Sequence, residues 1–186
     1  MRANRVAYVL ADPTACMPSP LLVACCGLPG VGKSTVSAYV AEQLPATRHR
    51  SDEVRHDLFD DPEYTPAEGR RTYDELLDRT RAGLDAGEAV VVDGTFKHVH
   101  DRDRIASVAT ETGATARFVH VTCPPATVRD RLRSRTDDAS DADVEVYQQH
   151  REQFEPPDRE HVTVDNSGSL EDTYRQVDRR LLPEQG

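Results

Sequence analysis

A glycine-rich segment at residues 27–34 is the strongest constraint on how this chain can fold. It reads Gly-Leu-Pro-Gly-Val-Gly-Lys-Ser and fits the pattern G-x-x-x-x-G-K-[ST]. The apolar run Leu21–Cys26 precedes it, and an amphipathic pattern from about Lys33 to Leu44 follows it. In the order strand, glycine-rich turn, helix, backbone N–H groups and the helix N-terminus converge on one place. The segment therefore predicts a phosphate-binding loop.

We expect the parts of this loop to have separate roles toward ATP. The glycines let N–H groups approach the β- and γ-phosphates, Lys33 supplies a positive charge, and the Ser34 hydroxyl binds Mg²⁺. Asp93 ends the apolar run 89–93 and is placed to reach the same ion through water; a turn-capping aspartate is the alternative. The predicted nucleotide-binding set is Gly27, Leu28, Pro29, Gly30, Val31, Gly32, Lys33, Ser34 and Thr35, with Lys33 also catalytic and with Ser34 and Asp93 as metal ligands.

The rest of the chain alternates short apolar runs with longer helical patterns. Strands are predicted at 21–26, 47–50, 89–93, 117–122 and 162–164, and helices at 33–44, from 52, at 66–87, at 100–113, from 124 or 125, and at 170–182. Fully apolar strands alternating with helices predict a parallel sheet covered on both faces. We expect one domain over residues 21–186, a loose proline-containing extension over 1–20, and a mobile polar loop at 134–143.

A short polar segment, Ser51–Arg55, follows the second predicted strand, where a doubly wound sheet binds its ligands. Asp52 and Arg55 lie three residues apart on the first helical turn, so both can face one cleft. We predict that Asp52 is the general base for an attacking hydroxyl and that Arg55 binds an anionic group of the acceptor. The alternative is that Ser51 or Asp52 only caps the helix. Lys97, beyond Asp93, is a further predicted substrate-binding residue.

Four arginines occupy alternate positions after Pro125: Arg129, Arg131, Arg133 and Arg135. At about 100° per residue, Arg131 and Arg135 share one helix face, and the other two share nearly the opposite one. We expect Arg131 and Arg135 to be catalytic, neutralising the phosphoryl group from a helical lid that closes over the nucleotide. A solvated helix with surface ion pairs is the alternative.

The composition is acidic and poor in lysine. The net charge is −10, and 33 acidic residues stand against 23 basic ones, of which only Lys33 and Lys97 are lysines. Such a surface is typical of adaptation to concentrated salt, which screens self-repulsion; a GC-rich genome that favours arginine codons is the alternative. We expect a cytoplasmic protein with reduced cysteines, no signal peptide and no membrane span.

Together these segments resemble the zeta-toxin and polynucleotide-kinase-like branch of P-loop kinases, whose members are often labelled AAA-family ATPases. The resemblance covers about residues 21–180 and rests on GLPGVGKST, SDEVR, VVVDGTF, CPP with an R-x-x-x-R, and SDADVEVYQQHREQFEPP. It implies an α/β three-layer sandwich with five parallel strands ordered 2-3-1-4-5 and a helical lid. It also implies that Asp52 is the general base, that Arg55 contacts the acceptor and that Arg131 and Arg135 belong to the lid.

The sequence therefore favours a kinase that transfers the γ-phosphoryl group of ATP, with Mg²⁺, to a hydroxyl of a small molecule. Gly94 stands where motor-type ATPases carry glutamate, and no N-K-x-D guanine motif occurs. A 5′-hydroxyl nucleic-acid kinase and an ATP-binding switch or ATPase remain alternatives, although the acidic surface argues mildly against nucleic acid. A closed pocket beside Asp52 would favour the small-molecule kinase, and an open basic groove would favour the nucleic-acid kinase. An Asp52 buried away from the phosphates would favour the ATP-binding switch or ATPase.

Overall fold

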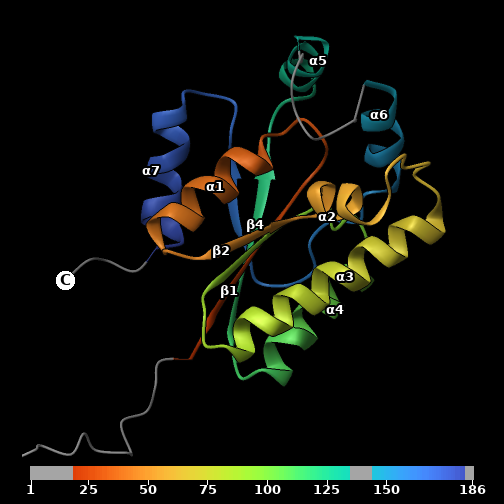
Figure 1. Ribbon diagram of the computed structural model, residues 1–186. Coiled ribbons are helices and arrows are strands. Elements are labelled where there is room, and N and C mark those ends of the chain that lie inside the picture. Colours follow the sequence, from red (N-terminus) through yellow and green to blue (C-terminus); the bar gives the residue numbers. More distant parts are fainter. Residues whose placement is uncertain (1–18, 135–143, 183–186) are drawn as a thin grey trace, which may run out of the picture.

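The computed structural model describes residues 19–134 and 144–182 (Figure 1). The strands are β1 (Leu21–Cys26), β2 (Thr47–Arg50), β3 (Val90–Asp93), β4 (Thr115–Thr122) and β5 (Val162–Asp165). The helices are α1 (Lys33–Gln43), α2 (Ser51–Leu58), α3 (Pro66–Asp85), α4 (Val99–Glu111), α5 (Pro125–Ser134), α6 (Val144–Gln153) and α7 (Leu170–Arg180). Arg135, residues 1–18 of the expected extension and nearly all of the expected mobile loop lie outside the described residues.

All five strands form one parallel sheet in the order β2-β3-β1-β4-β5. This confirms the strand order and fold class predicted from the sequence. The register places Cys25 beside Asp93 and Asp93 beside Arg50, so three strands end at nearly the same level. The glycine-rich loop, Asp93 and the start of α2 therefore meet at one edge of the sheet.

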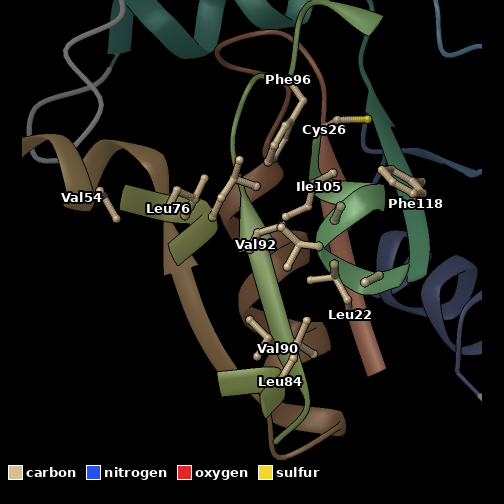
Figure 2. Close-up of a cluster of buried hydrophobic side chains, with 14 residues drawn as sticks. Leu22, Cys26, Val54, Leu76, Leu84, Val90, Val92, Phe96, Ile105 and Phe118 are labelled. Carbon is tan, nitrogen blue, oxygen red and sulfur yellow. The ribbon is translucent and has the colours of Figure 1, made fainter. Parts of the chain in front are cut away.

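Alternation along β1 divides the core into two layers. Leu22 and Cys26 belong to a cluster beneath α3 and α4, which Figure 2 shows with Val92 and Ile105 between sheet and helices. Val23 and Cys25 belong to a second cluster beneath α1 and α7. The helices accordingly cover both faces of the sheet (Figure 1). Cys25 and Cys26, adjacent on β1, therefore lie on opposite faces of the sheet.

Pairing with neighbours sets some boundaries that apolar patterning leaves open. Strand β4 begins at Thr115 rather than at 117, because Thr115 pairs with Leu21 and its N–H donates to the carbonyl of Pro20 (2.8 Å). Helix α3 begins at Pro66 as expected, since Thr65 and Glu68 form a reciprocal capping box. Among the described residues, no helix is both long and apolar enough to cross a membrane.

Candidate active site

The loop between β1 and α1 has a backbone that only glycine adopts without strain at two key positions. Gly27 has φ 145° and Gly32 has φ 93°. A β-carbon at Gly27 would collide with the carbonyl oxygen of Val121, and one at Gly32 would collide with the side-chain amide of Asn166. The loop is thus wrapped tightly against β4 and the segment after β5. Lys33 folds back over it and donates to the carbonyl of Leu28 (3.1 Å).

Asn166 is a buried residue behind this loop whose importance sequence reasoning missed. Its side chain is 3% exposed and donates from Nδ2 to the carbonyl of Val31 (2.9 Å), while Oδ1 accepts from the Thr173 hydroxyl (2.9 Å). Its backbone N–H donates to Thr122 on β4 (2.8 Å), and its carbonyl accepts from Arg131 on α5 (2.8 Å). One asparagine therefore joins the loop to β4, α5 and α7. Its position directly after an apolar strand is the signal that could have identified it.

The two predicted metal ligands, Ser34 and Asp93, both lie against the guanidinium of Arg50. Nη2 of Arg50 donates to the Ser34 hydroxyl (3.1 Å), and Nε lies 3.8 Å from Oδ2 of Asp93. Asp93 is 3% exposed and also accepts from the Ser37 hydroxyl (3.0 Å). The hydroxyl and carboxylate oxygens are ligands of the kind that Mg²⁺ prefers, and they surround a position where a positive charge is already stabilised. The donor set therefore fits a magnesium ion.

Two arginines on β2 support the start of α1 and were also missed. Arg48 and Arg50 lie two residues apart, so both side chains leave the same face of the strand. Arg48 donates to the backbone carbonyl of Ser34 (3.1 Å), whereas Arg50 donates to the hydroxyl of the same residue. Arg50 also forms an ion pair with Glu53 (3.1 Å). The spacing R-x-R on a predicted edge strand was the available signal.

A cavity of about 730 Å³ opens beside the loop and gathers most of the predicted site. Its lining includes Lys33, Asp52, Arg55, Asp93 and Lys97, which come from α1, α2, β3 and the segment after β3. Ser51 and Asp52 both lie within α2, whose cap residue is Arg50, so neither is the N-cap residue. The capping alternative therefore does not account for Asp52, whose position places a carboxylate in the cavity.

Arg55 lies on the α3 side of this cavity and is held from two directions. Its guanidinium lies 4.8 Å from the ring centre of Tyr64, and Nη1 is 3.8 Å from a carboxylate oxygen of Glu68. Glu68 is itself engaged by the backbone N–H groups of Glu63 and Thr65 (both 3.2 Å). Nη1 of Arg55 is buried and makes no hydrogen bond with any described residue. It is thus a fixed cation with a donor still to be satisfied.

The segment after β3 carries Lys97 and is fastened to the chain that follows α6. Nζ of Lys97 donates to Gln153 (2.6 Å), and the carbonyl of Lys97 accepts from the N–H of Glu155 (2.9 Å). Arg102, 1% exposed, donates to the carbonyls of Phe96 (2.7 Å) and Glu155 (3.1 Å). Arg102 therefore joins two segments of backbone and, unlike Lys97, does not line the cavity.

Helix α6 closes the opposite side of the cavity through Val146, Gln149 and His150, which share one face at spacings of three and four. Burial, and then the positive charges of Lys97, Lys33 and His98, lower the pKa of His150 to about 4. The imidazole is therefore neutral at neutral pH. Its Nδ1 is buried and makes no hydrogen bond within the described part of the chain. His150 was not predicted as a site residue, although it lies in the segment SDADVEVYQQHREQFEPP that carries part of the family resemblance.

Arg131 lies beside the glycine-rich loop, as the lid hypothesis expects, but its contacts are with the protein itself. Nη2 donates to the carbonyl of Asn166, and Nη1 lies 3.6 Å from the sulfur of Cys123. Nη1 is also 3.8 Å from where a β-carbon at Gly32 would stand. Arg133, on the other helix face, is exposed and near Asp130 (4.0 Å). Arg135, its predicted partner at the nucleotide, lies beyond the described residues.

Strand order, glycine-rich loop and the paired serine and aspartate define a P-loop nucleotide-binding fold. The family model described as "AAA domain" matches residues 22–157, and the chain belongs to this family of P-loop proteins. An uncharacterized protein of Mycobacterium tuberculosis is 29% identical over 132 residues, which cover 64% of this chain and 26% of that protein. The chain thus spans about a quarter of the length of the curated relatives it matches.

Solved structures share the fold across most of this chain. A putative kinase of Chloroflexus aurantiacus has a TM-score of 0.68 and 22% identity, with 88% of this chain and all of that chain covered. A gluconokinase of Sinorhizobium meliloti has a TM-score of 0.65 and 22% identity, covering 85% and 89%. The Mycobacterium tuberculosis APS kinase, solved with AMPPNP and APS, has a TM-score of 0.68 and 19% identity, covering 87% and 97%.

Proposed function

We propose that this protein is an ATP-dependent kinase that phosphorylates a hydroxyl group of a small molecule. The observation that carries the proposal is the cavity in which Asp52 and Arg55 share one space with Lys33 and Asp93, next to the glycine-rich loop. A carboxylate at this place is where an attacking hydroxyl would need its proton acceptor. The kinases named among the solved structures support the proposal through their shared fold.

In the proposed reaction the protein acts mainly by positioning and by charge. The loop N–H groups and Lys33 bind the β- and γ-phosphates of ATP. Asp52 accepts the proton of the acceptor hydroxyl as its oxygen attacks the γ-phosphorus, and the bond from that phosphorus to the bridging oxygen of ADP breaks. Arg131, together with Arg135, is proposed to neutralise the transferring group, and Arg55 and Lys97 to bind the acceptor.

Ser34 and Asp93 would hold the Mg²⁺ that accompanies ATP. When bound, the ion supplies positive charge to the phosphate oxygens. Arg50 then has to give up its contact with Ser34, and Glu53, already 3.1 Å away, can keep its guanidinium paired. We place the chain in the zeta-toxin and polynucleotide-kinase-like branch on the segments that resemble it.

A small acceptor is favoured over nucleic acid by the shape of the site. A volume of about 730 Å³ lies within the roughly 300–1,000 Å³ usual for small-ligand pockets. α2, α3 and α6 line it on different sides, whereas a 5′-hydroxyl strand needs an open basic track. A non-kinase ATP switch would have no use for a carboxylate and a buried, unsatisfied arginine donor in the same cavity.

The Asp52→Asn variant tests the proposal. The amide keeps the shape of the side chain and removes the proton acceptor, so we expect single-turnover phosphoryl transfer to slow by about 10²–10⁴-fold. The affinity for ATP, measured by calorimetry, should stay within about twofold of the wild type, because the loop and Lys33 bind the phosphates.

Asp57→Asn is the matched control, since it makes the same chemical change further along α2, where the carboxylate pairs with Arg79 outside the cavity lining. It should transfer phosphate at nearly the wild-type rate. Transfer by Asp52→Asn at the wild-type rate would show that Asp52 is not the base. The kinase proposal itself is tested with pooled sugars, polyols, nucleosides and 5′-hydroxyl oligonucleotides. If the protein hydrolyses ATP and phosphorylates none of them, the kinase proposal is refuted.

A further inference from the structure

The cavity beside Asp52 collects positive charge in a chain that is otherwise strongly acidic. The net charge of the chain is −10, yet five basic and four acidic side chains line this space. Both lysines of the chain, Lys33 and Lys97, are among the five. Cations gathered in one small volume repel one another, so their presence here in an acidic protein indicates a binding role for this cavity.

Pairing inside the cavity leaves an excess of cations on its acceptor side. Arg104 is neutralised by Asp74 at 2.5 Å, and Asp93 faces Arg50. Arg70, on α3, is exposed to the cavity and forms no ion pair with any described residue. Arg55 lines the same cavity from α2, and its partner Glu68 also accepts from the backbone N–H of Thr65 at the cap of α3. Arg55 and Arg70 are therefore two cations that the folded protein neutralises incompletely.

Two residues that line the cavity from different helices each carry a buried polar atom without a hydrogen bond to any described residue. Nη1 of Arg55 comes from α2 and Nδ1 of His150 comes from α6, and neither makes a hydrogen bond with a described residue. A buried donor or acceptor without a partner destabilises a fold, so such atoms at a cavity wall indicate bonds to a ligand. Nη1 of Arg55 can donate to an acceptor oxygen of a ligand, and Nδ1 of His150 can bond a hydroxyl or a similar oxygen-bearing group.

We infer that the phosphoryl acceptor is an anionic hydroxy compound, with a carboxylate or phosphate held by Arg55 and Arg70 and a further oxygen hydrogen-bonded to His150. This rests on the proposed function, since it names the acceptor class of the same site. A planar guanidinium binds either anion through two parallel bonds, which a neutral alcohol does not offer. Because His150 is neutral, the arginines alone neutralise the charge of the anion. His150 hydrogen-bonds another oxygen atom of the acceptor on the α6 side of the cavity.

The test uses matched acceptor pairs that differ only in charge. The full-length protein, labelled ATP and Mg²⁺ are incubated with gluconate or glucitol, glycerate or glycerol, and glucose 6-phosphate or glucose. We expect the anionic member of at least one pair to be phosphorylated with a kcat/KM at least about tenfold above that of its neutral partner, the value of one bond to a charged group. Calorimetry with AMPPNP present gives the Kd of each compound independently of turnover.

Two variants assign the preference to residues. Arg70→Ala should weaken the binding of the preferred anion about three- to tenfold and leave the binding of its neutral partner unchanged. The control is Arg175→Ala, at an exposed arginine of α7 paired with Glu171, which should change the affinity for neither compound. His150→Phe keeps a ring of similar size and should raise the KM for anionic and neutral acceptors alike, with the Kd of ATP unchanged.

The outcomes separate this inference from the proposed function. Equal use or equal binding of the two members of every pair would overturn the anionic acceptor and leave a kinase of neutral alcohols. An Arg70→Ala effect no larger than that of Arg175→Ala would equally overturn it. Absence of transfer to any acceptor counts against the kinase, and the calorimetric Kd values then still decide the charge preference: anions that bind no tighter than their partners refute it.

Discussion

Replacing Asn166 by alanine removes a side chain that joins the glycine-rich loop to α7. The change takes a donor from the Val31 carbonyl and an acceptor from the Thr173 hydroxyl, which retains its bond to Ser169. An unsatisfied buried carbonyl costs about 1–3 kcal/mol, and the loss of a satisfied bond costs about 1 kcal/mol. We therefore expect a destabilisation of about 2–4 kcal/mol, or a fall in Tm of about 5–15 °C for a chain of this size.

The same change loosens the loop that binds the phosphates. Val31 and Gly32 are held against Asn166, and a loop free to leave that position has to be ordered again when ATP binds. We expect the Kd of ATP to rise about tenfold, or about 1.4 kcal/mol. Differential scanning calorimetry measures the Tm, and isothermal titration calorimetry measures the Kd at a temperature well below it.

Ser167→Ala is the control, because Ser167 is exposed and bonds Asp165 through its backbone N–H. Ser167→Ala should change neither the Tm nor the Kd of ATP. If Asn166→Ala melts within about 2 °C of the wild type and binds ATP equally well, Asn166 does not support the loop and the reasoning from its four contacts is wrong. A lower Tm with unchanged ATP affinity would limit its role to stability.

The remaining predictions concern the loop, the surface and a buried histidine. Lys33→Ala should lower ATP turnover by at least about 10²-fold with an unchanged far-UV circular dichroism spectrum, and near wild-type turnover would exclude a working phosphate site. The Tm should rise between 0.1 M and molar KCl, as screening relieves the −10 charge; a flat or falling Tm would contradict salt adaptation. Burial, then His161 and Arg102, lower the pKa of His120 to about 4, so the unfolded chain binds the extra proton below about pH 6.5 and stability falls as the pH is lowered from there toward 4. His120→Gln should lose less stability than the wild type between pH 7 and 5 in urea unfolding, and an equal loss would show that His120 does not contribute.

Much of the local structure could be predicted because it depends on neighbours in the chain. The run Leu21–Cys26 is apolar on both faces, as a central parallel strand must be, and Pro66 after Thr65 predicts the start of α3. The pattern of residues 27–34 indicated a turn in which glycine is required, and Gly27 and Gly32 have positive φ. The strand order 2-3-1-4-5 came from the family resemblance and is confirmed.

The roles of individual polar residues were predictable only where a motif names them. Lys33, Asp52, Arg55 and Asp93 were selected from their spacing, and the fold brings all four to one cavity, although their chemical roles stay predictions. Asn166 belongs to no motif, and His150 lies in a segment that resembles the family without a role of its own. Their significance depends on which backbone and which cavity they face, and that depends on how β5 and α6 pack.

The sequence by itself determined that a P-loop follows the first strand, because positive φ, a close backbone approach and a helix start are all required of the same eight consecutive residues. Only the tertiary structure decided what surrounds that loop. Arg50 reaches Asp93 through strand pairing over 43 residues of sequence, Asn166 reaches Val31 over 135, and His150 faces a cavity built mostly by α2, α3 and the segment after β3. Such contacts are fixed by the burial of two core layers against one sheet, which no local pattern records.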